Sequence, residues 1–314
     1  MRPTGEQFEI ASGPYRAVVI EVGATLRGLW YDERPLIRGF GEEAAMPVYR
    51  GAILAPWPNR IGDGRYEWGG KRHQLPLNEP ERQCALHGLV AWLRWSCEKR
   101  DEQSVTLSCV IWPQPGYPFV VGLSVTYGLA ADGLTISLSA DNRGSSPAPY
   151  GCSIHPYLVP GPEPMESWNL RLRAASFVTV DPERLLPTGQ APVAGTKFDF
   201  QNGRAVANSV IDHAFTDIEF DESGMCDALV TAQDGSGVRI TWDRRCRWVQ
   251  IHTADRPEAE YNRAGLAIEP MTCPPDAFRS GEGLHTLEPG AAHEAWWRLA
   301  YAPPGPERDR NVRR

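Results

Sequence analysis

The sequence lacks the marks of membrane and nucleic-acid-binding proteins. Its 314 residues contain no apolar run near the ~18 residues that a membrane-spanning helix needs. Positive charge is not in excess either, because 32 Lys and Arg stand against 39 Asp and Glu, for a net charge of −7. A protein that follows nucleic-acid phosphates needs a basic surface. We therefore expect neither a membrane nor a nucleic acid as a partner.

The seven cysteines lack the spacing of a zinc ribbon or a disulfide framework. No two of them form a C-x-x-C pair, and their number is odd. The first residues also lack the basic and apolar regions of a secretory signal peptide. Free, mostly buried thiols in a reducing compartment are the simplest interpretation, so the predicted location is cytoplasmic.

Motifs for common cofactors and nucleophiles are missing as well. The sequence has no glycine-rich phosphate-binding loop, no H-E-x-x-H, and no two histidines three to five residues apart. The segment 151–155 falls one residue short of G-x-S-x-G, and no strand-to-helix turn surrounds it. We therefore predict no cofactor and no metal, and the sequence disfavours a serine hydrolase.

Alternating apolar and polar residues are abundant, whereas helical spacing is scarce. An Asp-Gly turn at 131–133 between two such runs indicates a hairpin. Many short strands without intervening helices predict an all-β, antiparallel sandwich or barrel. No composition shift divides the chain, so we expect one domain over 1–302 and a disordered tail over 303–314. The expected strands are 15–22, 105–112, 120–127, 134–140, 170–173, 177–180, 238–242, 248–252 and 296–301.

Two residues of the polar clusters that lie beside expected strand ends stand directly before prolines, a position that favours extended backbone. These are His155 and Glu269. Strand alternation then places Ser153 on the same face as His155, and it turns Ile268 to the face opposite Glu269, toward the core. A carboxylate and an imidazole are common acid–base groups in active sites. The sequence thus offers one such pair on two extended segments.

A third segment, 248–252, places alternate residues on one face. Trp248, Gln250 and His252 share that face, and Val249 and Ile251 share the other. An indole beside an amide could stack on a sugar and form hydrogen bonds with it, which makes Trp248 and Gln250 candidate binding residues. The alternative interpretation is that Trp248 is a large, partly buried side chain.

Several short motifs together resemble the aldose 1-epimerase (galactose mutarotase) family. They occur in the family's order and span about residues 50–280. The motifs are Asn59-Arg60-Ile61, Gly64-Arg65-Tyr66, His87-Gly88, His155-Pro156-Tyr157, Leu186-Pro-Thr-Gly189 with Gly195-Thr196, Phe198-Asp-Phe200, Asp212-His213 and Glu269-Pro270-Met271-Thr272. The resemblance implies a large antiparallel β-sandwich of the galactose mutarotase-like type, with an aldohexose bound in an open cleft on one curved sheet.

The resemblance also implies a role for each matching residue. Glu269 would be the general base and His155 the general acid. His87 would lie near the anomeric centre, while Arg60 and Asp212 would hold sugar hydroxyls, with Asn59 beside them. Ring opening needs one proton removed from the anomeric hydroxyl and one delivered to the ring oxygen, which two such groups can supply without a metal. Reference pKa values of ~4.3 and ~6.5 predict an ionised Glu269 and a protonatable His155.

The residues alone leave other functions open. A glycoside hydrolase would need two carboxyl groups at a defined separation, which Glu269 and Asp212 could form. A non-catalytic carbohydrate-binding module would keep the cleft without the chemistry. Within the epimerase interpretation, a hexose carrying a 6-phosphate or a sulfonate is a further variant, since Arg65, Arg94 and Arg263 could meet an anionic group.

Overall fold

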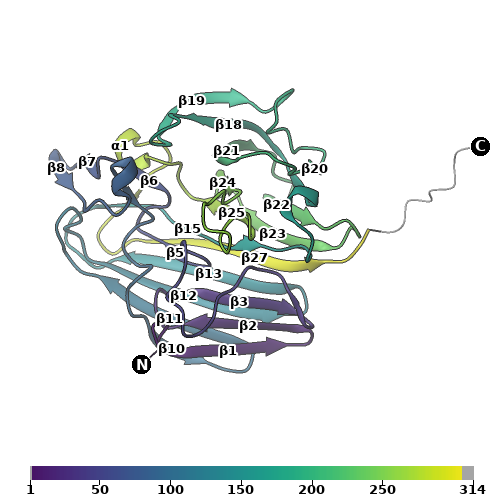
Figure 1. The fold of residues 1–314 in the computed structure, drawn as a ribbon. Helices are drawn as coiled ribbons and strands as arrows, with labels where there is room; N and C mark the ends of the chain where they lie inside the picture. Colours follow the sequence, from purple (N-terminus) through teal and green to yellow (C-terminus); the bar gives the residue numbers. More distant parts are fainter. Residues whose placement is uncertain (1, 306–314) are drawn as a thin grey trace, which may run out of the picture.

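The structure, a computed structural model, describes residues 2–305 and shows antiparallel β-sheets throughout (Figure 1). The predicted all-β fold is confirmed. Residues 306–314 of the predicted tail lie outside the described part of the chain. Helix is confined, within that part, to three short pieces. These are η1 (Pro80–Arg82), η2 (Met165–Ser167) and α1 (Ala277–Ser280).

The largest sheet has nine strands and crosses the middle of the molecule (Figure 1). The predicted hairpin lies within it, with Ala130 paired to Gly133 across a two-residue turn. In spatial order the strands are β10 (Ser96–Arg100), β11 (Ser104–Ile111), β12 (Val121–Ala130), β13 (Gly133–Asn142), β27 (Ala292–Ala302), β23 (Gly237–Asp243), β22 (Met225–Thr231), β17 (Asn169–Leu172) and β20 (Arg204–Ala205).

A second sheet of six strands lies above the nine-stranded one in Figure 1 and carries much of the candidate site. One of its strands, β24, has the predicted bounds 248–252. In spatial order the strands are β16 (Tyr157–Leu158), β25 (Leu266–Met271), β24 (Trp248–His252), β21 (Asp212–Ile218), β18 (Ala174–Val180) and β19 (Pro187–Pro192).

A four-stranded N-terminal sheet and four two-stranded ribbons complete the described strands. The sheet contains β1 (Gln7–Ser12), β2 (Tyr15–Ile20), β3 (Leu26–Tyr31) and β4 (Arg34–Pro35). The ribbons are β5 (Ile53–Leu54) with β15 (Ser153–Ile154), β6 (Arg60–Gly62) with β9 (Cys84–Leu86), β7 (Arg65–Trp68) with β8 (Lys71–Gln74), and β14 (Ala148–Tyr150) with β26 (His285–Leu287).

One face of the nine-stranded sheet supplies the centre of the core. Trp297 lies opposite Ile136 on β13 and opposite Trp242 on β23, and directly paired residues point to the same face. Strands β1 and β2 pack on β12, while the indole of Trp297 donates a hydrogen bond to the carbonyl of Pro270 on β25 at 3.0 Å. The six-stranded sheet thus has one face in the core, and its other face carries the polar residues of the candidate site together with some apolar ones.

Candidate active site

His155 and Glu269 meet over the six-stranded sheet. His155 lies between β15 and β16, and Glu269 lies in β25. Strand β16 pairs with β25, with Tyr157 opposite Ala267, which brings the two segments together. Nε2 of His155 is 3.4 Å from Oε1 of Glu269, and both side chains are buried. An imidazole and a carboxyl group this close can exchange a proton.

The predicted alternation of faces is present in both strands that carry this side of the site. Ile268 in β25 and Val249 and Ile251 in β24 belong to the main core. Gln250 lies directly opposite Glu269 in the ladder between β24 and β25, so the two share the other face. Apolar residues on one face therefore anchor the strands that present polar residues on the other.

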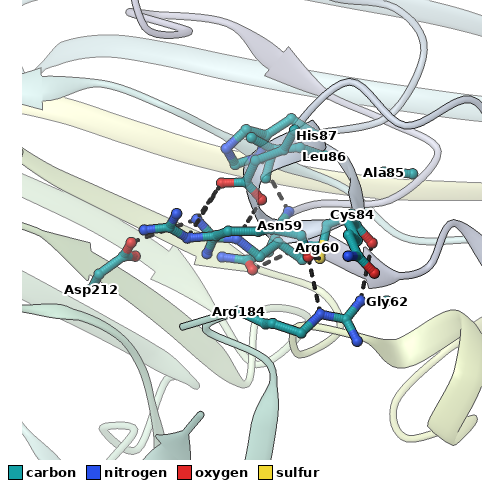
Figure 2. A network of polar contacts seen from close by, with 12 residues as sticks. Asn59, Arg60, Gly62, Cys84, Ala85, Leu86, His87, Arg184 and Asp212 are labelled. Atoms are coloured by element: carbon teal, nitrogen blue, oxygen red, sulfur yellow. Dashed lines mark hydrogen bonds and ion pairs between the residues drawn. The ribbon is translucent and has the colours of Figure 1, made fainter. Parts of the chain in front are cut away.

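Asp212 joins the same polar face from the next strand. It lies opposite His252 in the pairing of β21 with β24, and its Oδ1 accepts a hydrogen bond from Nε2 of Gln250 at 2.6 Å. Nη2 of Arg60 lies 3.7 Å from its other oxygen (Figure 2). Burial favours the neutral carboxyl, but His252, Arg60 and the Gln250 amide outweigh it and hold the pKa of Asp212 below its usual value.

Arg60 is held in place by a second carboxylate. It begins β6, and Glu79 lies directly before η1. Nε and Nη2 of Arg60 donate to the two oxygens of Glu79 at 2.8 and 2.9 Å, and both residues are buried. Burial opposes the charge of Arg60, but Asp212 and Glu79 outweigh it and raise its pKa. This two-bond geometry fixes the plane of the guanidinium.

Asn59 and His87 occupy an unusual backbone arrangement beside Arg60. Both have left-handed φ values, 56° and 59°. The His87 amide donates to the carbonyl of Asn59 at 2.9 Å, and the Asn59 amide donates to Nδ1 of His87 at 3.2 Å. Since Nδ1 accepts this hydrogen bond, the neutral ring carries its own proton on Nε2. Such strain is typical of sites where geometry serves function.

Aromatic rings restrict the imidazole of His155 on two sides. Tyr157 stacks on it with ring centroids 5.0 Å apart and planes inclined by 11°. His87 meets it edge-on at 5.0 Å. Tyr49 in turn packs edge-on against His87 at 4.7 Å. Packing against these aromatic rings therefore fixes the position of the His155 imidazole.

These residues line one cleft with a volume of about 220 Å³. Seven of the eight residues that the sequence proposes for catalysis or sugar binding line it. They are Glu269, His155, Arg60, His87, Asp212, Asn59 and Gln250. Trp248 does not line the cleft. It is buried in a separate apolar cluster with Val178, Ala214 and Met271, in agreement with the alternative interpretation that it is a packing residue.

The cleft also contains residues that the sequence did not single out. His252 lies on the predicted face of β24, and its Nδ1 is 3.7 Å from Asp212. The alternation of faces along 248–252 could have suggested His252 as a cleft residue. No pattern in the sequence pointed to Glu79. Its contact with Arg60 joins two residues that are nineteen positions apart, and only the folded chain brings them together.

Burial changes the protonation expected for the central pair. It raises the pKa of Glu269 well above its usual value and lowers the pKa of His155 to about 3. Both shifts favour the neutral form of the group, whereas reference pKa values predict an ionised Glu269 and a readily protonated His155. Burial thus makes it easier for a proton to reside on Glu269 and harder for one to reside on His155.

Three of these residues also have the spacing of a metal-ligand set. One donor atom each from His87, His155 and Glu269 lies within 4.8 Å of the others. However, Nδ1 of His87 accepts a hydrogen bond from the Asn59 amide, so Nε2 of the neutral ring is a donor rather than a free ligand. The three could hold a metal ion only if His87 gave up that arrangement.

Comparison with known proteins places the chain in a family. The family model for aldose 1-epimerase matches residues 6–300. The chain belongs to the aldose 1-epimerase family. It is 34% identical to the uncharacterized protein YihR of Escherichia coli over 95% of this chain and 94% of that one, and 26% identical to galactose mutarotase of Mus musculus over 95% of each.

Solved structures of the aldose 1-epimerase family share the fold. A GalM/aldose epimerase homologue from C. elegans superposes with a TM-score of 0.84 at 22% identity, covering 96% of this chain and 99% of that one. Galactose 1-epimerase from Lactobacillus acidophilus gives 0.79 at 21% identity, covering 94% and 93%. The predicted galactose mutarotase-like sandwich is thus confirmed. Membership of this family, which acts on sugars, supports an epimerase.

The arginines proposed for an anionic substituent do not line the cleft of this family member. Arg65 lines a separate hollow, Arg94 pairs with Glu21, and Arg263 pairs with Asp255. Exposed Arg256 is the arginine that joins Arg60 in the cleft lining of the described chain. Within residues 2–305, none of the helices has the length and apolar character to cross a membrane.

Proposed function

We propose that this protein interconverts the α and β anomers of an aldohexose, with Glu269 as the general base and His155 as the general acid. The observation that carries the proposal is their 3.4 Å contact, buried at a cleft rich in hydrogen-bonding groups. The name of the mouse relative, galactose mutarotase, supports the same chemistry.

One shared proton is enough for the reaction. Ring opening requires the form of the pair in which His155 carries the proton and Glu269 is ionised. Glu269 then removes the proton of the anomeric hydroxyl while His155 gives its proton to the ring oxygen, and the C1–O5 bond breaks to leave an aldehyde. After half a turn about the C1–C2 bond, the same transfers in reverse close the ring as the other anomer. The raised pKa of Glu269 makes it a stronger base once it is ionised.

Several polar atoms of the cleft have no partner within the described residues. They include Oε1 of Gln250, Oε2 of Glu269 and Nδ1 of His155, all of them buried. Buried polar atoms are nearly always hydrogen-bonded in proteins, so these atoms are available to bind a polar ligand or ordered water. A hydroxyl-rich sugar supplies donors and acceptors for them, while Nε2 of His87 offers a further donor.

The test is anomer exchange of α-D-glucose and α-D-galactose, followed by NMR saturation transfer against buffer. We expect wild type to accelerate exchange, and Glu269→Gln and His155→Asn each to reduce kcat by about 10²–10⁴-fold. Glu282→Gln, at an exposed position, is the matched control and should retain activity. The wild-type rate should fall at low pH, when the pair gains a second proton, and at high pH, when it loses its only one.

Other outcomes of this experiment point to other functions. Wild-type activity in Glu269→Gln would show that Glu269 is not the general base. Release of the aglycone from a chromogenic glycoside would favour a hydrolase. Sugar binding with exchange no faster than in buffer would favour a carbohydrate-binding module.

A further inference from the structure

Two arginines are buried in the described part of the chain, and one of them has no carboxylate partner. Arg60 pairs with Glu79 and Asp212. Arg50 is only 5% exposed, yet within residues 2–305 its side chain forms no ion pair and no hydrogen bond, and its Nε is buried without a partner. A buried charge without a counter-ion is costly. Proteins keep groups that cost stability mainly where function needs them.

Two aromatic rings surround Arg50 in place of a carboxylate. Its guanidinium lies over the rings of Tyr157 and Tyr261, 5.7 and 5.3 Å from their centroids. Both distances are within the ~6 Å at which a cation is attracted to the face of an aromatic ring. Burial lowers the pKa of Arg50, and the charge of Arg38 acts in the same direction. The tyrosine rings are therefore the groups in direct contact that favour its charged form.

Tyr157 is also the ring on which the imidazole of His155 stacks. The two centroids are 5.0 Å apart, and the planes are inclined by 11°. The hydroxyl of Tyr157 donates a hydrogen bond to the carbonyl of Val48 at 3.2 Å. Arg50 thus contacts the ring that supports His155, although Arg50 itself does not line the cleft.

The segment that carries this arginine also binds the backbone of His155. The Gly51 amide donates to the carbonyl of His155 at 2.8 Å, and the His155 amide donates to the carbonyl of Ala52 at 3.0 Å. Val48, in the same segment, has a left-handed φ of 44°. That conformation is strained for a β-branched residue, and such strain is typical of segments whose geometry serves function. Residues 48–52 therefore hold the general acid through both its backbone and its ring.

We propose that Arg50 is a positioning residue for anomer exchange, because its cation–π contact holds the ring of Tyr157 and that ring orients the imidazole of His155. This inference rests on the proposed function of the cleft. An imidazole that is free to tilt no longer presents its proton to the ring oxygen of the sugar, and small displacements of a catalytic group lower the rate strongly. Since Arg50 does not line the cleft, it acts on the chemical step rather than on sugar binding.

The test replaces Arg50 with methionine, which removes the charge and leaves an unbranched apolar side chain. On the hexose that wild type exchanges faster, we expect Arg50→Met to lower kcat about tenfold while KM changes by less than about twofold. The midpoint of urea unfolding should stay the same or rise, because an apolar side chain replaces a buried charge that has no counter-ion. Lower kcat at equal or higher stability cannot result from poor folding.

Three further variants show how Arg50 acts. Arg50→Lys keeps the charge and should recover most of the lost kcat. Arg16→Met is the matched control, because Arg16 lies over the ring of Trp30 at 3.9 Å, outside the cleft lining, and its kcat should equal that of wild type. In a Tyr157→Leu background, Arg50→Met should lower kcat by less than about twofold further, since the ring through which it acts is gone.

The possible results separate the inference from the proposed function. Wild-type kcat in Arg50→Met would overturn the inference and leave the epimerase intact, and so would a rise in KM at constant kcat, which would make Arg50 a binding residue. Equal losses with and without the ring of Tyr157 would show that Arg50 does not act through it. A loss of kcat that comes with a lower unfolding midpoint, or that Arg50→Lys does not recover, would also contradict the inference. If wild type exchanged neither glucose nor galactose faster than buffer, the proposed function would fail, and the inference with it.

Discussion

The guanidinium of Arg60 is buried between carboxylates that come from two distant segments. Glu79 binds it through two hydrogen bonds, and Asp212 lies 3.7 Å from Nη2. A buried ion pair contributes little net stability, since both charges lose their hydration. Removing one partner is costly nonetheless, because the other charge remains buried. We therefore interpret the main role of the Arg60–Glu79 pair as positioning Arg60 in the cleft.

At the residue scale, we expect Glu79→Gln to lower the free energy of unfolding by about 3 kcal/mol, because it leaves a buried guanidinium incompletely paired. KM for the sugar should rise as Arg60 becomes mobile. Urea unfolding and exchange kinetics measure the two effects.

The control for this substitution is Glu67→Gln. Glu67 pairs with Arg72 at 2.9 Å on the surface, and exposed pairs contribute only about 0–1 kcal/mol. If both substitutions lowered the free energy of unfolding equally, burial would not be the reason for the cost of breaking the Arg60–Glu79 pair.

Among the elements, the turn after β9 sets the orientation of His87. His87 and Gly88 both have left-handed φ values, 59° and 76°. A Cβ atom on Gly88 would lie 2.0 Å from the carbonyl oxygen of Ala55, which is backbone and cannot easily move. Glycine is therefore required here both for its φ and for the close approach of two chain segments.

We expect Gly88→Ala to destabilise the protein and to reduce anomer exchange, since the turn that carries His87 must shift. Gly70→Ala is the matched control, because Gly70 has a similar φ of 72° and a Cβ atom added there would meet nothing within 4 Å. The control should lose about 1–2 kcal/mol from its backbone conformation alone and keep its activity. Thermal unfolding and exchange rates of both variants check this, and a smaller loss in Gly88→Ala than in Gly70→Ala would contradict it.

Strands with clean alternation could be predicted from the sequence, and strands without it could not. Strand β24 has the predicted bounds, and the 131–133 turn forms the predicted hairpin. Strand β21 escaped prediction because His213, Ala214 and Phe215 break the alternation and the neighbouring strands decide its place. Six of the seven cleft residues were found because their motifs stand in the family's order, and Gln250 was found from strand alternation.

In the molecule as a whole, six of the seven histidines have pKa values below the usual one, and burial is the largest cause for each. They are His87, His155, His213, His252, His285 and His293, with values of about 3 for His155 and about 4 for His293. As pH falls below ~6.5, the unfolded chain binds protons at these groups while the fold does not. Their stabilisation is present above that pH and is lost as pH falls through the lower values. The raised pKa of Glu269 acts in the opposite direction, since acid relieves the burial of its charge.

We therefore expect the free energy of unfolding to fall by more than about 2 kcal/mol between pH 7 and pH 5, the loss that one histidine held neutral in the fold would produce. Urea unfolding at several pH values measures it. His293→Asn, outside the cleft lining, should make the decline shallower. A stability that is constant or rises toward pH 5 would contradict this account.

The sequence by itself determined the all-β class and the bounds of β24, and it was enough to propose the acid–base pair. Those features depend on local alternation, on turn chemistry and on prolines, which act within a few residues. Tertiary structure alone decided that Trp248 enters a separate apolar cluster, that Glu79 binds Arg60, and that burial shifts the pKa values of the central pair. The physical reason is that packing partners, ion-pair distances and desolvation arise only when segments far apart in the chain are brought into contact.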